Sequence, residues 1–175
     1  MLKKQIYLTG FMGTGKSTIL NGLHELFGFQ KIEMDEQIIR EQGMSISEIF
    51  EKKGEGYFRD LETELVKRIS DMDEVVVSCG GGTVMRQCNV DAMKKKGVII
   101  LLTATPQTVY QRVKNSHNRP LLEKNMNPEY IEQLMEARRS KYEAAADYII
   151  QTDDRTAKEI CLEINKRLKY DDNRI

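Results

Sequence analysis

The residues best suited to chemistry stand near the start of the chain, in the run Gly10-Phe11-Met12-Gly13-Thr14-Gly15-Lys16-Ser17. The run matches G-x-x-x-x-G-K-[S/T] at every fixed position and lies between a short apolar stretch and a helical pattern. Its glycines allow a tight turn that aims backbone N–H groups at phosphate oxygens, and the following helix adds the positive end of its dipole. Lys16 would bring positive charge to the β- and γ-phosphates, and Ser17 a hydroxyl to Mg²⁺. The predicted nucleotide-binding residues of this phosphate loop are Gly13, Thr14, Gly15, Lys16, Ser17 and Thr18.

Two carboxylates, Glu33 and Asp35, follow the next predicted strand. They are two residues apart, so they share a side if the strand persists through them. One carboxylate beside a Mg²⁺–phosphate site can hold the water shell of the metal, and another can accept the proton of an attacking hydroxyl. Asp35 also suits the N-cap of the helix that follows, and the two roles are compatible.

Three consecutive glycines, Gly80-Gly81-Gly82, follow a run of three valines. Each glycine costs roughly 0.5–1 kcal/mol more chain entropy on folding than alanine does. A simple strand-to-helix turn needs only one of them. The triplet therefore favours the close approach of a ligand to the backbone N–H groups over a turn that binds nothing.

Arginines are the third class of candidate, because a planar guanidinium suits carboxylates and phosphates. Arg59, Arg138 and Arg139 lie on predicted helices, where a single arginine is more often a surface ion-pair partner. Arg119 differs, because it stands in the polar segment from 115 to 127, which has no periodicity. An arginine-bearing segment of this kind near a phosphate site is typical of a lid.

Strand and helix patterns alternate along the chain and must position these groups. We expect strands at 5–9, 29–34, 74–78, 98–102 and 148–150. Helices are expected at 18–28, 35–42, 45–53, 57–70, 89–96, 105–114, 127–145 and 155–168, with breaks at Gly54 and Gly56 and a stop at Gly97. Further end signals are a capping box at Ser45 to Glu48, cap–proline pairs at Thr105 and Asn127, and a stop at Gly43. Because β–α–β connections keep one hand, the order predicts a three-layer, doubly wound α/β fold with a five-stranded parallel sheet. Ligands gather at the carboxyl ends of such strands, where all the groups above would meet.

Length and composition limit the remaining possibilities. The 175 residues suggest one domain, and 27 basic against 27 acidic residues give no net field that would favour nucleic acid. No apolar run reaches the length of a membrane span, and the amino-terminal residues lack a signal-peptide core. Cys79, Cys88 and Cys161 have neither metal-site nor disulfide spacing, and Cys79 is expected to be a small buried filler. We therefore expect a cytoplasmic monomer that has no nucleic-acid or membrane partner.

With these features the chain resembles the shikimate kinases, small P-loop enzymes with a nucleoside-monophosphate-kinase-like fold, from Ile6 to about Leu168. The resemblance implies transfer of the γ-phosphoryl group of ATP, with Mg²⁺, to the 3-hydroxyl of shikimate, a step in aromatic amino acid biosynthesis. Its carriers are the phosphate loop, Ile32-Glu33-Met34-Asp35, Gly54-Glu55-x-x-Phe58-Arg59, Gly80-Gly81-Gly82, Asn118-Arg119-Pro120-Leu121-Leu122, and Arg138 four residues before Tyr142.

The resemblance also implies roles for single residues. Lys16, Asp35 and Arg119 would be catalytic, with Asp35 as the base and Arg119 reaching the transferring phosphate from a lid at about 112–125. Within a substrate-binding segment at about 33–61, Arg59 would hold the substrate carboxylate together with Arg138. The remaining implied contacts are Gly80, Gly81 and Gly82 with the substrate ring, Arg112 and, more loosely, Arg155 with adenine, and Ser17 and Glu33 with the metal.

One position departs from the family pattern, because Glu33 stands where the family usually has aspartate. The longer side chain keeps the charge but changes its reach, which puts the metal geometry in doubt more than the substrate. Two other functions stay open. One is a related kinase whose acceptor is gluconate or a nucleoside monophosphate, which the Arg59 and Arg138 pair disfavours. The other is an ATP-binding module without transfer chemistry.

Overall fold

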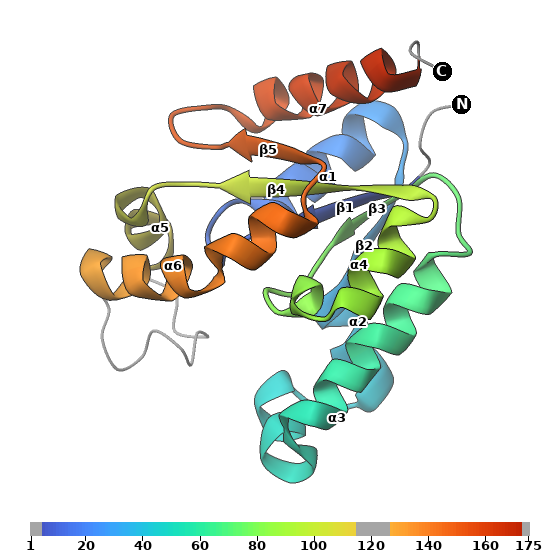
Figure 1. Ribbon diagram of the computed structural model, residues 1–175, viewed down its shortest axis with the longest axis vertical. Coiled ribbons are helices and arrows are strands. Elements are labelled where there is room, and N and C mark those ends of the chain that lie inside the picture. The colour runs from blue at the N-terminus through green and yellow to red at the C-terminus, as the bar shows by residue number, and fades with distance from the viewer. Residues whose placement is uncertain (1–4, 115–126, 173–175) are drawn as a thin grey trace.

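The computed structural model describes residues 5–114 and 127–172, and its centre is one parallel sheet (Figure 1). The sheet has five strands in the order β2-β3-β1-β4-β5. Every neighbouring pair is parallel, so the predicted doubly wound fold is confirmed. The strands are β1 (Gln5–Thr9), β2 (Gln30–Glu33), β3 (Val75–Ser78), β4 (Gly97–Thr103) and β5 (Tyr148–Gln151).

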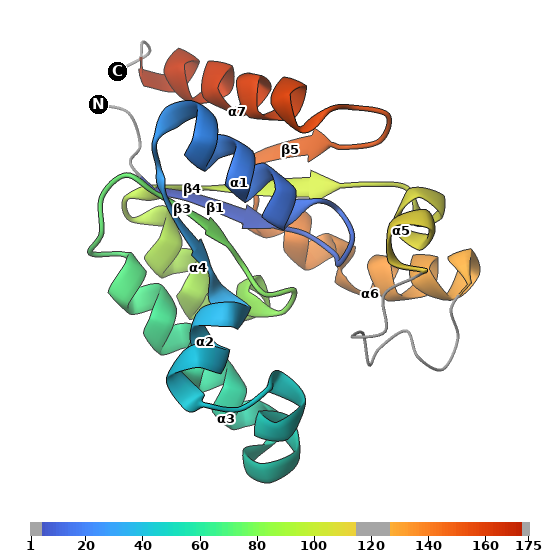
Figure 2. The ribbon, with the colours of Figure 1, turned by 180° about the vertical axis from the view of Figure 1, so that it is seen from behind.

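Helices cover both faces of the sheet and complete the three layers (Figures 1 and 2). Helices α1 and α7 lie on one face, and α2, α3, α4 and α6 pack on the other. The helices are α1 (Lys16–Phe27), α2 (Met34–Gln42), α3 (Ile46–Ile69), α4 (Gln87–Lys94), α5 (Pro106–Val113), α6 (Pro128–Ala145) and α7 (Ala157–Asp172), with a 3-10 turn η1 at Thr83–Met85. None of the helices in the described part of the chain combines the length and apolarity needed to span a membrane.

The central strand β1 shows how the sheet divides the core. Ile6 and Leu8 join the cluster beneath α1 and α7, whereas Tyr7 joins the cluster beneath α3, α4 and α6. All three side chains are 0% exposed, as expected for a parallel strand that is covered on both faces. Burying one such side chain contributes about 1.5–3 kcal/mol to the free energy of folding, so β1 holds the start of the following loop in a fixed position.

Several of the predicted end signals of the helices are confirmed. Ser45 and Glu48 form a complete capping box at the start of α3. The side chains of Thr105 and Asn127 accept backbone N–H groups at the starts of α5 and α6, each followed by proline. Gly43 ends α2 in the left-handed conformation. These signals act within four residues of chain, which is why sequence alone shows them.

Other boundaries differ from the sequence prediction. The helix predicted to break at two glycines continues from Ile46 to Ile69 with a kink at Gly54 alone (φ 85°, ψ 164°), and Gly56 lies inside it. The turn η1 was not predicted, and α4 begins at Gln87, two residues before the expected start. Gly97 does not close that helix but begins β4, where a Cβ atom would lie 2.6 Å from the Tyr7 ring.

Buried Gln5 ties the sheet to the carboxyl end of α3. Its Nε2 donates to the carbonyls of Ser70 at 3.0 Å and Met72 at 2.6 Å, and more weakly to that of Ile69 at 3.4 Å. The hydroxyl of Tyr7 donates to Gln5 Oε1 at 3.1 Å, which fixes the orientation of the amide. Gln5 therefore satisfies carbonyls that the end of a helix leaves without intrahelical partners.

We expect Gln5→Ala to lower the free energy of unfolding by about 2–3 kcal/mol, because buried carbonyls lose their donor. Urea denaturation measures the change. Gln30→Ala is the control, since Gln30 lies on the edge strand β2 and is exposed, and it should cost less than about 0.5 kcal/mol. Equal losses for the two variants would contradict this role of Gln5.

Candidate functional site

The phosphate loop joins the end of β1 to the first residue of α1, as the sequence predicts. Gly13 and Gly15 have φ angles of 76° and 98°, in a region that other residues rarely adopt. The hydroxyl of Thr14 donates to the Phe11 carbonyl at 2.7 Å and closes the turn. Lys16 Nζ donates to the carbonyls of Gly10 and Phe11 at 2.8 and 3.1 Å, so its ammonium group is held against the loop.

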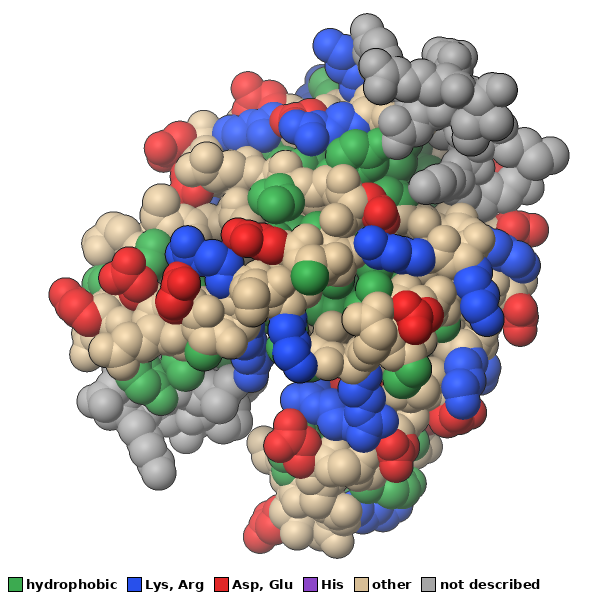
Figure 3. Space-filling model, viewed as in Figure 1, with side chains coloured by type: hydrophobic (Ala, Val, Ile, Leu, Met, Phe, Trp, Pro, Cys, Tyr) green, Lys and Arg blue, Asp and Glu red, His purple; other side chains and the backbone are tan. Residues whose placement is uncertain are grey.

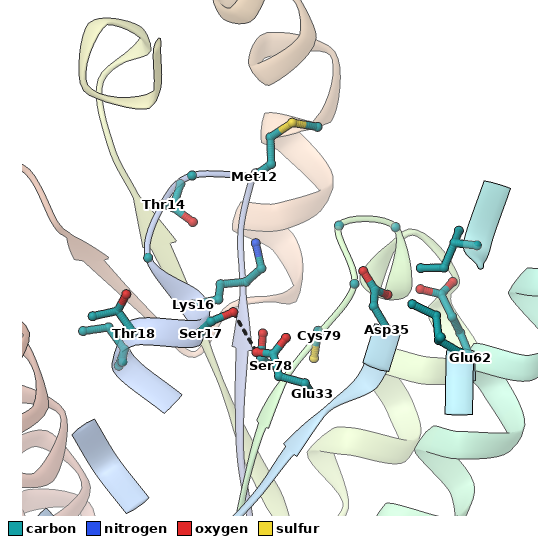
Figure 4. Close-up of a pocket in the computed structure, with 18 of the residues that line it drawn as sticks. Met12, Thr14, Lys16, Ser17, Thr18, Glu33, Asp35, Glu62, Ser78 and Cys79 are labelled. Carbon is teal, nitrogen blue, oxygen red and sulfur yellow. Dashed lines mark hydrogen bonds between the residues drawn. The ribbon is translucent and has the colours of Figure 1, made fainter. Parts of the chain in front are cut away.

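Two oxygen ligands suited to Mg²⁺ meet beside this loop (Figure 4). The hydroxyl of Ser17, at the start of α1, donates to Glu33 Oε1 at 2.9 Å, at the end of β2. Among the described residues no group of three histidine, cysteine, aspartate or glutamate side chains could hold a metal ion. The pair therefore fits a metal that takes most of its other ligands from phosphate groups and water.

Asp35 lies two residues after Glu33, and its side chain lines the same cleft. The prediction that Asp35 is the N-cap of α2 is wrong. The N-cap is Glu33, with φ −90° and ψ 109° and no side-chain cap bond, and the helix begins at Met34. Asp35 therefore lies inside the first turn, and Figure 4 shows it between Lys16 and Glu62.

The glycine turn, Gly80 to Gly82, leaves room for the side chains of the site itself. A Cβ atom on Gly80 would lie 2.8 Å from a carboxylate oxygen of Asp35 and 2.8 Å from one of Glu62. A Cβ atom on Gly82 would overlap the guanidinium group of Arg59. The triplet is therefore more than a flexible turn, because its missing side chains make space for charged groups.

Glu62 is a component of the site that the sequence analysis missed. Its side chain is 1% exposed and accepts from Arg59 Nη1 at 2.7 Å and from the Thr83 hydroxyl at 2.8 Å. Partial burial acts to lower the pKa of Arg59, but Glu62 and Glu55 outweigh it and raise that pKa. The three-residue spacing of Arg59 and Glu62 on one helix was the available signal.

Arg138 reaches the cleft from α6, on the other side of the glycine turn. A Cβ atom on Gly81 would lie 3.4 Å from Arg138 Nη1. The Tyr142 hydroxyl, one helical turn later, donates to the Gly81 carbonyl at 2.6 Å and fixes α6 against the turn. In the space-filling view a hollow separates α6 from α3, and Lys and Arg side chains gather at its rim (Figure 3).

The predicted adenine-side arginines lie at the opposite end. Arg112 Nη1 donates to the Gly13 carbonyl at 3.0 Å and to Thr152 Oγ1 at 3.1 Å. Arg155 pairs with Glu163 at 2.6 Å. Arg119, with most of the predicted lid at 112–125, lies outside the described residues.

The thiols of the described chain are all free. Cys79 forms part of the floor of the cleft, is 2% exposed, and has its pKa raised by burial. A thiol that stays protonated is a poor nucleophile, so Cys79 is the buried filler that the sequence predicts.

A single cleft of about 1730 Å³ connects these groups. Its walls combine the phosphate loop, the Ser17 and Glu33 pair, Asp35 and the glycine turn, with Ile46, Phe50 and Phe58 as an apolar wall. The arginines that line it are Arg59, Arg112, Arg138 and Arg155. Helices and strands from both halves of the chain contribute to it. The cleft can hold a polyphosphate at one end and a small carboxylate at the other.

Comparisons with known proteins agree on one family. A family model described as shikimate kinase matches residues 12–169. The shikimate kinases of Thermodesulfovibrio yellowstonii and Persephonella marina are each 41% identical, over 93% and 95% of this chain and 94% and 99% of their own lengths. Among solved structures, the shikimate kinase from Acinetobacter baumannii in complex with shikimate has a TM-score of 0.88 at 31% identity, covering 96% of this chain and 94% of that one. A gluconokinase from Sinorhizobium meliloti, at 17% identity and a TM-score of 0.61, shares the fold alone.

Because the Arg59–Glu62 pair is buried, we expect removal of its negative charge to lower the stability of the fold. Glu62→Gln should lower the free energy of unfolding by about 2–3 kcal/mol, because Arg59 then lacks its buried counter-charge. Glu64→Gln is the matched control, since Glu64 pairs with Lys67 on the same helix at the same 2.7 Å and the same spacing but is 65% exposed. It should cost less than about 0.5 kcal/mol. Similar losses of unfolding free energy for the two variants in urea denaturation would show that burial of the Arg59–Glu62 pair does not increase its contribution to stability.

Proposed function

The chain belongs to the shikimate kinase family and phosphorylates shikimate with ATP and Mg²⁺, and we propose how its own residues carry out this step of the shikimate pathway. One observation carries the proposal: the phosphate loop and the residues predicted to bind the acceptor line the same cleft. With both ligands bound there, the γ-phosphoryl group and an acceptor hydroxyl would lie next to each other. A gluconate acceptor and a non-catalytic ATP-binding module, the open alternatives, do not fit membership of this family.

On the nucleotide side, the N–H groups of Gly13 to Thr18 bind the phosphates, and Lys16 offsets charge on the transferring group. The adenine lies against Arg112 and Arg155, which line the same end of the cleft. Mg²⁺, when bound, neutralises phosphate charge, and Ser17 and Glu33 are the residues that would hold it. The catalytic role of Arg119 stays a prediction from the resemblance.

On the acceptor side, Arg59 and Arg138 bind the carboxylate of shikimate from two directions, since they flank the glycine turn. The backbone of Gly80 to Gly82 packs against the ring. Asp35 hydrogen-bonds the 3-hydroxyl and takes its proton as the new bond from oxygen to the γ-phosphorus forms. The bond from that phosphorus to the bridging oxygen of ATP breaks, and ADP leaves.

We also propose that the chain is one kinase domain whose segment from 33 to 61 binds the acceptor, and that it works as a cytoplasmic monomer. The free thiols of the described chain suit a reducing compartment, where ATP is also present.

The carboxylate clamp predicts that Arg138→Ala raises the KM for shikimate roughly 30- to 100-fold, because a charged hydrogen-bond pair is lost. The KM for ATP should change less than about threefold. Arg139→Ala is the matched control, since the neighbouring Arg139 is 57% exposed and pairs with Glu136. A normal KM for shikimate in Arg138→Ala would exclude Arg138 from the clamp.

The contact between Glu33 and Ser17 predicts a change in metal dependence. Glu33→Asp shortens the side chain by one methylene group, so the carboxylate lies farther from Ser17. The Ser17 hydroxyl is then available to the metal. We expect the half-saturating Mg²⁺ concentration to fall about threefold, measured both by activity and by Mn²⁺ binding to the ADP complex. Glu36→Asp, on the exposed side of α2, should change neither measurement. Identical curves for Glu33→Asp and the unmodified enzyme would leave Glu33 without a metal role.

A further inference from the structure

Thr152 lies directly after edge strand β5 and is 2% exposed, and its hydroxyl joins three segments at the nucleotide end of the cleft. Oγ1 lies 3.1 Å from the Thr14 carbonyl, 3.0 Å from the Thr103 carbonyl and 3.1 Å from Arg112 Nη1. The backbone carbonyl of Thr152 also accepts from Arg112 Nη2 at 3.2 Å. One buried side chain therefore links the phosphate loop, β4 and α5.

The chemistry of these groups fixes the direction of each hydrogen bond. A guanidinium group can only donate, so the Thr152 hydroxyl accepts from Arg112. Its single proton is then available to the two carbonyls, of which that of Thr103 already accepts the backbone N–H of Thr152 at 2.8 Å. Valine has a similar shape but can neither donate nor accept, so it would remove every contact of the hydroxyl at once.

These contacts control the orientation of peptide groups in the phosphate loop. In a planar trans peptide the carbonyl and the next N–H point in opposite directions. When Thr152 holds the Thr14 carbonyl, the Gly15 N–H is turned away from Thr152 and towards the phosphate side. Gly15 has φ 98° and ψ 18°, and a glycine is free to leave that conformation unless neighbours restrain it. Arg112 restrains the preceding peptide in the same way through the Gly13 carbonyl.

We propose that Thr152 is a positioning residue of the nucleotide site, whose hydroxyl holds Arg112 and the Thr14–Gly15 peptide in the orientation that receives ATP. This inference rests on the nucleotide roles proposed above for the phosphate loop and Arg112, and it adds the side chain that orients both. Thr152 itself does not touch the reacting atoms.

The neighbouring residue strengthens the link between β5 and α5. The carboxylate of Asp153 accepts from the Thr105 N–H at 3.0 Å and from the Thr105 hydroxyl at 2.9 Å, at the start of α5. Partial burial acts to raise the pKa of Asp153, but hydrogen bonds from Thr108, Thr105 and Gln151 outweigh it and lower that pKa to about 2. Asp153 is therefore charged at neutral pH and holds one end of α5, while Thr152 holds Arg112 near the other.

The test measures ADP binding by calorimetry and the KM values for ATP and shikimate. Thr152→Val should weaken ADP binding and raise the KM for ATP about tenfold each, with the KM for shikimate within about twofold. Thr152→Ser keeps the hydroxyl and should stay within about threefold of the unmodified enzyme in every measurement. Thr103→Val is the matched control, since Thr103 contributes only its carbonyl here, and it should change nothing. If Thr152→Val does not fold, Thr152→Ala carries the same expectation.

A double-mutant cycle separates this inference from the function on which it rests. In the Arg112→Ala background, Thr152→Val should weaken ADP binding by no more than about threefold, because Arg112, one of the two groups that Thr152 orients, is gone and only the effect on the Thr14–Gly15 peptide is left. Two results would overturn this inference but leave the proposed role of Arg112 intact. In the first, the losses of ADP affinity in the two single variants multiply in full in the double variant. In the second, Thr152→Val binds ADP normally although Arg112→Ala clearly does not. No loss in Arg112→Ala would overturn both the proposed role of Arg112 and the inference.

Discussion

The acceptor side of the cleft depends on one buried carboxylate. Glu62 is almost fully excluded from water, so it requires the guanidinium group of Arg59 and the Thr83 hydroxyl as partners. That guanidinium occupies the space which a side chain at Gly82 would fill. The ion pair and the glycine turn therefore form one unit, since a side chain at Gly82 would displace the Arg59 guanidinium group from its place in the pair. Because α3 carries both charged residues, the same unit fixes this helix against the carboxyl end of β3.

The nucleotide side is held together by different chemistry. There Lys16 and Arg112 are oriented by backbone carbonyls of the phosphate loop. Each carbonyl accepts a hydrogen bond from the cation and so fixes the position of its charged group. Arg59, in contrast, shares its charge with Glu62 and Glu55 before any substrate arrives. The two ends of the cleft therefore position their cations through different groups, backbone carbonyls at the nucleotide end and carboxylates at the acceptor end.

The sequence predicts those parts of the fold that depend on local interactions. The phosphate loop, the caps at Ser45 and Thr105 and the alternation of strands and helices are each encoded within a few residues, and they are confirmed. Two other features depend on distant contacts. Gly97 packs against the Tyr7 ring from a neighbouring strand, and Thr152 contacts a loop 138 residues away. No periodicity or spacing shows such pairs before the sheet brings them together.

The kink at Gly54 separates two functions within α3. The part after the kink carries Arg59 and Glu62 and continues to a carboxyl end that Gln5 ties to the sheet. The part before it contributes Ile46 and Phe50, and the Phe50 ring lies 5.1 Å from that of Phe58. Both parts are anchored to the same core cluster, the part before the kink through Ile49, which is 0% exposed, but the kink at Gly54 separates the apolar wall from the charged clamp. Substitutions in 46–53 should therefore change acceptor binding through the shape of the apolar wall, because the arginines that bind the acceptor carboxylate lie outside this segment.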